Sequence, residues 1–192
     1  MSSPRIPMLS VDESAAAAAE VRVPSTLAEL NVFRTLLRRP KTAKAINDLL
    51  LSLLFGGTLD DRLRELVIMR IGWATGSDYE WTQHWTVAQD PFGVSADELL
   101  ALRDWEASDA FGDVERAVLA ATDEALATGT ASGATIATCR DLLGSDDAVL
   151  ELVASIATWR WISQVARSLD IPLEDGVASW PPDGQVSPNH TV

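Results

Sequence analysis

The chain has 192 residues, of which 47% are hydrophobic and 22% are charged, and its net charge is -13. This length and composition suit one folded domain with a full hydrophobic core. The negative charge repels phosphate backbones and anionic lipids, so we expect neither nucleic acid nor a membrane surface as a partner. An anionic substrate would need an arginine close to its binding site.

The cysteine count and the N-terminal composition bear on the cellular compartment. Cys139 is the single cysteine, which excludes an intrachain disulfide and a zinc site built mainly on thiolates. Helical spacing around it predicts a small core residue. No apolar stretch reaches the roughly 20 residues that cross a bilayer. Asp12, Glu13 and Glu20 bracket the alanine run at 15–19 too closely for a signal peptide, so we expect a cytoplasmic protein.

The first half of the chain is a series of helical patterns separated by capping residues, prolines and glycines. Ser10 with Glu13 forms a capping-box pattern, which predicts a short N-terminal helix over the alanine run. Pro24 and Ser25 begin the next element, which ends before Pro40. Beyond the N-terminal helix, the patterns predict helices over residues 27–39, 42–55, 60–74 and 77–89.

Capping residues and glycines also mark the ends of the later helices. Thr58 and Asp61 are the expected caps of the helix over 60–74, and Gly76 separates that helix from the next one. Ser95 with Glu98 is a second capping-box pattern. The remaining helices are predicted over residues 96–107, 114–127, 134–143 and 146–169.

The predicted fold class is all-α, a single domain of about eight helices, since no alternating run is long enough for a sheet. Three regions are expected: an N-terminal arm with a short helix over 1–24, the helical domain over 25–175, and a Pro/Gly-rich tail over 176–192. After Pro172 no periodic apolar pattern remains, so the tail is either disordered or draped over a neighbour.

The strongest candidate for chemistry is a group of polar residues across two adjacent helices. Eleven residues separate Glu65 from Ser77, two separate Ser77 from Glu80, and three separate Glu80 from His84. Side chains three and four apart share one face of a helix, so Ser77, Glu80 and His84 line up. Histidine exchanges protons near neutral pH, and a neighbouring carboxylate favours its charged form. Glu80 with His84 is therefore a candidate acid/base pair, supported by Glu65.

The sequence leaves structural alternatives open for the same residues. Glu80 and His84 could form an ordinary solvent-facing ion pair at i, i+4 spacing. Arg62 and Arg64 could make Glu65 a simple surface charge, and only the packing of the two helices decides whether Glu65 reaches His84. We expect no metal site, because the folded region offers no second histidine as a ligand.

Other residues are candidates for substrate binding. Ser77 shares the face of the proposed pair, and Trp81 flanks it, although packing is the favoured role of Trp81. Trp159 could line a pocket. Arg70 and Arg160 lie in apolar helices, where a cation either pairs with a buried acid or holds a substrate carboxylate.

These motifs resemble the carboxymuconolactone decarboxylase family, which also contains the alkylhydroperoxidase D-type enzymes. The central block LDDRLRELVIMRIGWATGSDYEWTQHWTVAQDPFGVSADELLAL carries the resemblance, and similar segments on both sides extend it over about residues 25–175. The resemblance implies an alkylhydroperoxidase D-like helical fold that assembles as homotrimers or hexamers, with active sites near subunit interfaces.

The peroxidase branch of that family uses Glu-x11-Cys-x2-Cys-x3-His. Here Glu65 and His84 occupy the outer positions, but Ser77 and Glu80 replace both cysteines. Because a serine hydroxyl cannot reduce a peroxide, we expect no thiol peroxidase activity. The decarboxylase branch is similar in having a carboxylate and a histidine in place of the thiols.

By that likeness, the sequence predicts a cofactor-free decarboxylase, another lyase or an isomerase acting on a small organic acid or lactone. His84 and Glu80 would move protons while Glu65 assists. The alternative is a non-catalytic ligand-binding or assembly protein of the same fold, which would bind without turnover and tolerate replacement of His84. Thiol peroxidase activity is the least favoured reading.

Overall fold

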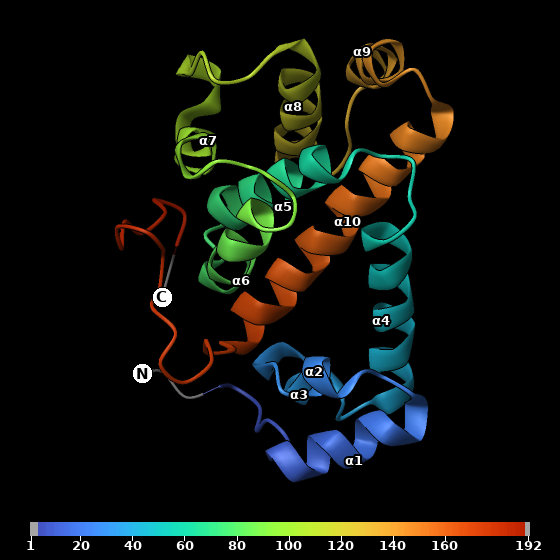
Figure 1. Ribbon diagram of the computed structural model, residues 1–192, viewed down its shortest axis with the longest axis vertical. Helices are drawn as coiled ribbons and strands as arrows, with labels where there is room; N and C mark the ends of the chain where they lie inside the picture. The colour runs from blue at the N-terminus through green and yellow to red at the C-terminus, as the bar shows by residue number, and fades with distance from the viewer. Residues whose placement is uncertain (1–3, 191–192) are drawn as a thin grey trace. The chain divides into compact units, whose positions relative to one another are not determined.

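The computed structural model describes residues 4–190, and these residues form α-helices, one 3-10 helix (η1) and no strand. The all-α prediction is confirmed. Figure 1 shows the helices in chain order. They are α1 (Val11–Val21), α2 (Ser25–Ala28), α3 (Asn31–Leu36), α4 (Pro40–Leu54), α5 (Asp61–Thr75), α6 (Asp78–Gln89), α7 (Ala96–Ala101), η1 (Leu102–Ala107), α8 (Asp113–Thr128), α9 (Gly133–Leu143) and α10 (Asp146–Leu169).

The chain divides into two compact units. The first comprises the residues up to Phe55 together with Val165–Val177, and the second comprises Gly56–Gln164 together with the residues from Ala178 onward. The helix α10 contributes its longer, N-terminal part to the second unit. Every residue of the candidate acid/base cluster belongs to the second unit, so that unit carries the site.

The first unit contains α1 to α4 and shows where a predicted helix is divided. The pattern over 27–39 forms two short helices, because Leu30 takes an extended backbone conformation (φ -70°, ψ 134°) between them. The carboxylate of Glu174 then accepts a hydrogen bond from the backbone N–H of Asn31 (2.8 Å), which supplies a partner at the start of α3. The next helix begins at Pro40, where a proline costs no helical hydrogen bond.

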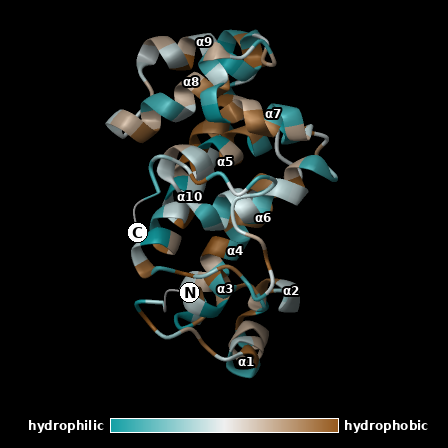
Figure 2. Ribbon diagram, turned by 90° about the vertical axis from the view of Figure 1, so that its left-hand side faces the viewer, coloured by the Kyte–Doolittle hydropathy of each residue, from teal (hydrophilic) through white to brown (hydrophobic). Residues whose placement is uncertain are grey.

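In the second unit α5 packs against α6, α8 and η1 and forms its centre. The side chains of Leu66, Val67, Ile68 and Met69 point in successive directions around this helix, yet each is fully buried. Figure 2 shows hydrophobic residues along the ribbon of α5. The N-cap of α5 is Asp60, whose side chain accepts from the backbone N–H of Leu63 (3.0 Å), and the expected caps Thr58 and Asp61 were wrong.

Residues 178–190, the described part of the C-terminal segment, lie against α5 and α6. The indole of Trp81 donates to the carbonyl of Pro181 (2.8 Å), and the hydroxyl of Ser187 donates to the carbonyl of Trp73 (2.7 Å). The side chain of Asn189 donates to the carbonyl of Ala74 (2.9 Å). This part of the predicted tail therefore covers the turn that joins α5 to α6.

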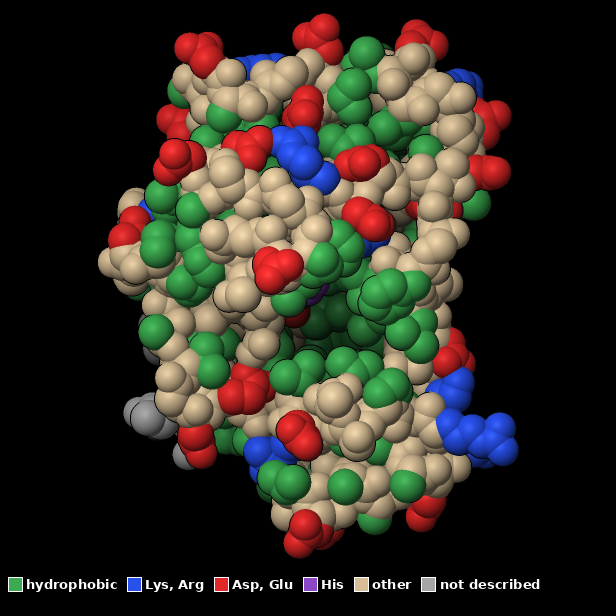
Figure 3. All heavy atoms as spheres, viewed as in Figure 1, with side chains coloured by type: hydrophobic (Ala, Val, Ile, Leu, Met, Phe, Trp, Pro, Cys, Tyr) green, Lys and Arg blue, Asp and Glu red, His purple; other side chains and the backbone are tan. Residues whose placement is uncertain are grey.

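The surface is acidic without one dominant cluster on the face in view. Figure 3 shows acidic side chains scattered among apolar and uncharged ones on this face. Within residues 4–190, no helix combines the length and the apolar composition that crossing a bilayer requires.

Candidate functional site

Two glycines allow α5 and α6 to approach closely enough to form the site. A Cβ on Gly72 would lie 2.9 Å from the backbone nitrogen of Trp81, so a larger residue in α5 would push α6 away. Gly76 ends α5 in the left-handed conformation (φ 69°), and Ser77 then caps α6. The chain therefore reverses within a few residues, which brings Glu65 of α5 beside His84 of α6.

Glu65 and His84 form a short hydrogen bond at the centre of the site. The distance from Glu65 Oε2 to His84 Nδ1 is 2.8 Å. The Glu65 side chain is fully buried, while 18% of the His84 side chain is exposed. The surface-charge alternative for Glu65 is thus excluded, because this carboxylate faces the histidine inside the protein.

Glu80 lies on the other side of the same imidazole. Its Oε2 is 4.0 Å from His84 Nε2, and only 4% of its side chain is exposed. Burial, aided by the like charge of Glu65 and opposed by His84, raises the pKa of Glu80 to about 7. A carboxyl group with that pKa exists in both protonation states at neutral pH, as a proton donor or acceptor requires.

Trp159 of α10 supplies the fourth member of the cluster. Its indole Nε1 donates to His84 Nε2 over 3.3 Å. An indole N–H can only donate, so in this arrangement Nε2 accepts, and the ring proton lies on Nδ1 and points to Glu65. The neutral imidazole is held between Glu65 and Trp159 with its ring orientation fixed by both.

The charges around His84 nevertheless favour its protonation. Burial acts to lower the pKa of His84, but the charge and the hydrogen bond of Glu65, together with the charge of Glu80, outweigh it and raise the pKa. Because the pKa values of both Glu80 and His84 are raised, a proton bound in this cluster can move between the Glu80 carboxylate and the His84 imidazole.

Arg64 is a member of the site region that the sequence did not single out as functional. Its side chain is only 2% exposed, and its Nη2 is 3.4 Å from Glu65 Oε1. It also pairs with Asp61 one turn earlier. Arg64 thus helps to balance the buried charge of Glu65, and its charge opposes protonation of His84. The sequence signal was its place directly before Glu65.

Three of the predicted substrate-binding residues have structural partners instead. Ser77 caps α6 by accepting from the backbone N–H of Glu80 (3.5 Å), and Trp81 packs among Trp73, Trp85 and Trp180. Arg70 makes a bidentate ion pair with Asp123 at 2.7 Å and donates to the carbonyl of Leu102. These contacts give each of the three side chains a structural role, and their predicted part in substrate binding stays a prediction.

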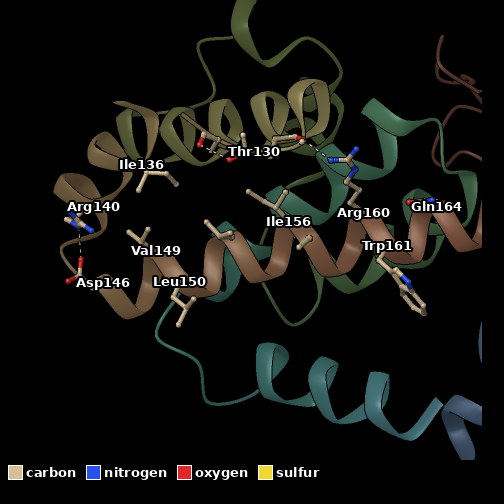
Figure 4. A pocket seen from close by; sticks show the side chains of 15 residues that line it. Thr130, Ile136, Arg140, Asp146, Val149, Leu150, Ile156, Arg160, Trp161 and Gln164 are labelled. Carbon is tan, nitrogen blue, oxygen red and sulfur yellow. Dashed lines mark hydrogen bonds and ion pairs between the residues drawn. The ribbon is translucent and has the colours of Figure 1, made fainter. Parts of the chain in front are cut away.

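Arg160 lies apart from the cluster. Although it follows Trp159 directly, its side chain extends from α10 toward α8, where Nη1 donates to the carbonyl of Ala125 (2.9 Å) (Figure 4). Successive residues of a helix point about 100° apart, so Trp159 and Arg160 serve different faces of α10. Of the two predicted candidates on this helix, Trp159 alone contacts His84.

Thiol and metal chemistry find little support in the part of the chain that is described. Cys139 is fully buried, its thiol donates to the carbonyl of Ala117 (3.5 Å), and burial raises its pKa. A neutral, enclosed thiol is a poor nucleophile. Among residues 4–190, no group of three or more His, Cys, Asp or Glu side chains is arranged to hold a metal ion.

Comparison with known proteins agrees with the fold and the motif. The model of the carboxymuconolactone decarboxylase family matches residues 40–124, a segment that includes Glu65, Glu80 and His84. Over these residues the chain is similar to the carboxymuconolactone decarboxylase family. No curated protein sequence matches the chain significantly.

Solved structures show that the alkylhydroperoxidase D-like fold extends beyond the carboxymuconolactone decarboxylase segment. A peroxidase-related protein from Ralstonia eutropha with an alkylhydroperoxidase AhpD core superposes with a TM-score of 0.74 at 17% identity, covering 97% of this chain and 99% of its own. A protein of unknown function from Agrobacterium tumefaciens, described as AhpD-like, gives 0.63 at 22% identity, covering 71% and 94%.

The debrominase Bmp8 is a third relative in fold. Its cysteine-to-alanine variant, solved in complex with 2,3,4-tribromopyrrole, gives a TM-score of 0.67 at 19% identity and covers 91% of this chain and 94% of its own. At these identities the likeness establishes the shared fold. The predicted alkylhydroperoxidase D-like architecture is confirmed.

Proposed function

We propose that this protein is a cofactor-free acid/base enzyme, a decarboxylase, another lyase or an isomerase, that acts on a small organic acid or lactone. The observation that carries the proposal is the buried hydrogen bond between Glu65 and His84, with Glu80 close to the second nitrogen of the ring. The carboxymuconolactone decarboxylase match over residues 40–124 supports the same class of chemistry.

In the proposed mechanism His84 and Glu80 exchange a proton with the substrate while Glu65 orients the imidazole. Loss of carbon dioxide breaks the bond between the carboxylate and its carbon, and the electron pair moves into a conjugated carbonyl of the substrate. Protonation of the resulting enolate by His84 or Glu80 completes the step. An isomerase would use the same two groups, one to remove a proton and the other to return it.

The surroundings of the cluster suit this role. Burial of both carboxylates strengthens their interaction with the imidazole, and the partial exposure of His84 leaves it accessible to a substrate. The enclosed Cys139 is the chain's single cysteine, so a thiol peroxidase mechanism is not part of the proposal even though one structural relative is described as peroxidase-related.

The same proposal includes a cytoplasmic location and assembly into a homotrimer or hexamer. The single cysteine suits a reducing compartment. Sedimentation of the purified chain tests the assembly: a monomer over a wide concentration range would contradict it. The net charge of -13 argues against nucleic acid as a partner.

The test is turnover of a panel of conjugated lactones and unsaturated carboxylic acids, followed by carbon dioxide release and by loss of ultraviolet absorbance. We expect His84→Ala and Glu80→Gln to lower kcat by about 10²- to 10⁴-fold on any substrate that the parent protein converts. Glu106→Gln is the matched control, since Glu106 is exposed and belongs to η1, away from the cluster.

Full turnover by His84→Ala would refute the assigned role of the histidine. Tight binding of a panel compound without conversion, unchanged in His84→Ala, would favour the non-catalytic ligand-binding alternative.

A further inference from the structure

A cavity lies in the second unit, between α8, α9 and α10 (Figure 4). Its volume is about 680 Å³, within the range of roughly 300–1,000 Å³ that is typical of small-molecule sites. None of Glu65, Glu80 and His84 lines it, so it is distinct from the acid/base cluster. Its walls include Ala125, Gly129, Ile136, Val149, Val153, Ile156 and Ala157.

Most of this lining is apolar, and part of it is open to solvent. Leu150 is 68% exposed and Val153 is 43% exposed, while Val149 and Ile156 form a buried floor. Apolar side chains on opposite walls of a cavity are stabilised when an apolar ligand displaces the water between them. The lining therefore suits the hydrocarbon part of a ligand.

Arg160 provides a charged group in this apolar lining. Among the described residues, no carboxylate lies within ion-pair distance of its guanidinium, and its single hydrogen bond goes to the carbonyl of Ala125. Several other arginines of this unit pair with acids, as Arg70 does with Asp123 and Arg103 with Asp183. Arg116 donates to backbone carbonyls, as Arg160 does, but it does not line the cavity. In a chain of net charge -13, an arginine that faces a cavity and has only a carbonyl partner is suited to receive an anion.

We propose that this cavity binds an amphipathic carboxylate, with the carboxylate on Arg160 and an aliphatic chain along α10 toward Val149. Arg160 lies eleven positions after Val149, and at 1.5 Å per residue this separation spans about 16 Å of helix, which gives the length of the apolar wall. At the other end of the cavity Arg140 is already paired with Asp146 (2.6 Å). The anion is therefore expected at the end that carries Arg160. This assignment stands independently of the proposed enzymatic activity.

The experiment measures binding of decanoate, decanol and decylamine to the full-length protein by isothermal titration calorimetry. These probes share one chain and differ in the charge of the head group. We expect decanoate to bind at least about tenfold more tightly than decylamine, because a charge-assisted hydrogen bond to Arg160 is available only to the anion. Arg160→Met should weaken decanoate by a similar factor and leave decanol nearly unchanged.

Two further variants separate loss of binding from loss of folding and from a general effect of removing an arginine. Val153→Trp places a bulky side chain in the cavity from a partly exposed position and should abolish binding of decanoate and decanol while the melting temperature stays close to that of the parent. Arg140→Gln, at the far end, is the matched control and should bind decanoate as the parent does.

Equal affinity for decanoate and decylamine, or retention of decanoate affinity in Arg160→Met, would overturn the proposal. So would the absence of decanoate binding to the parent protein, including the case in which sedimentation shows that a second copy of the chain covers the cavity.

Discussion

Trp159 and the two carboxylates act on His84 in opposite directions. The indole N–H occupies Nε2 only while that nitrogen is unprotonated, so Trp159 stabilises the neutral ring. Glu65 and Glu80 stabilise the imidazolium. A balance of this kind keeps the proton exchangeable, which a residue that both takes and returns a proton requires.

This balance predicts how the pKa of His84 responds to each partner. Trp159→Phe removes the donor to Nε2 and should raise the pKa of His84, whereas Glu65→Gln removes the principal favourable charge and should lower it. An NMR titration of the imidazole protons measures both shifts. A shift of the same sign in both variants would contradict the assignment of opposing roles.

The sequence identified part of this site and missed the rest for a physical reason. Glu65, Glu80 and His84 were recognised because helical spacing and a known motif place them within twenty residues of each other. The hydrogen bond from Trp159 joins positions 75 residues apart, and the ion pair of Arg70 with Asp123 joins positions 53 apart. Such partners depend on how helices pack, which a pattern along one helix does not contain.

At the scale of the elements, Gly76 couples the turn between α5 and α6 to the C-terminal segment. A Cβ at Gly76 would lie 2.4 Å from the backbone carbon of Asn189, and the residue has φ 69°. Gly144 ends α9 with φ 67° but has open space around it. Gly76 and Gly144 share the left-handed backbone conformation, but only Gly76 is covered by the C-terminal segment. Substitutions at the two glycines can therefore be compared directly.

We expect Gly76→Ala to cost more stability than Gly144→Ala. Left-handed strain alone is worth about 1–2 kcal/mol, and the displaced C-terminal segment should add about 1–3 kcal/mol at Gly76. Urea denaturation of the two variants measures the difference. In a chain that ends at Val177, the extra cost at Gly76 should vanish. Equal costs in the full-length chain would mean that the segment does not hold this turn.

Helix ends were predictable where a side chain acts on its own backbone. The capping boxes of Ser10 with Glu13 and of Ser95 with Glu98 are present where the sequence placed them. The division of the helix predicted over 27–39 was not predictable in this way, because the carboxylate that accepts from the first backbone N–H of α3 belongs to Glu174, 143 residues from Asn31. A capping side chain close in sequence therefore marks a helix end that the sequence can predict. An interruption that involves a residue far along the chain cannot be predicted in this way.

At the scale of the whole molecule, the buried acid/base cluster should leave a signature in the pH dependence of stability. Most shifted carboxyl groups here have a lowered pKa, as Asp183 has through its hydrogen bonds with Arg103. Such groups stabilise the fold at neutral pH and lose that contribution as the pH falls. Glu80 behaves in the opposite way, because its pKa in the folded protein, about 7, lies above the ordinary value of 4.5 for a glutamate.

Between pH 4.5 and 7 the folded state therefore holds a proton on Glu80 that the unfolded state has released, so stability falls as the pH rises. His84, whose pKa is also raised, contributes in the same direction above its unfolded value of 6.5. The shift of Glu80 corresponds to a loss of about 3 kcal/mol between pH 4.5 and pH 8. Glu80→Gln removes this loss because the amide does not titrate.

The measurement is the free energy of unfolding of Glu80→Gln minus that of the parent, from urea titrations at a series of pH values. Subtraction cancels the contributions of Asp183 and the other carboxylates that both proteins share. We expect the difference to rise by about 3 kcal/mol between pH 4.5 and pH 8 in favour of the variant. For Glu106→Gln, at an exposed position, the difference in the free energy of unfolding should not change with pH. A flat difference for Glu80→Gln as well would show that Glu80 keeps its ordinary pKa in the folded protein and is ionised at neutral pH, which removes it as the proton donor of the site.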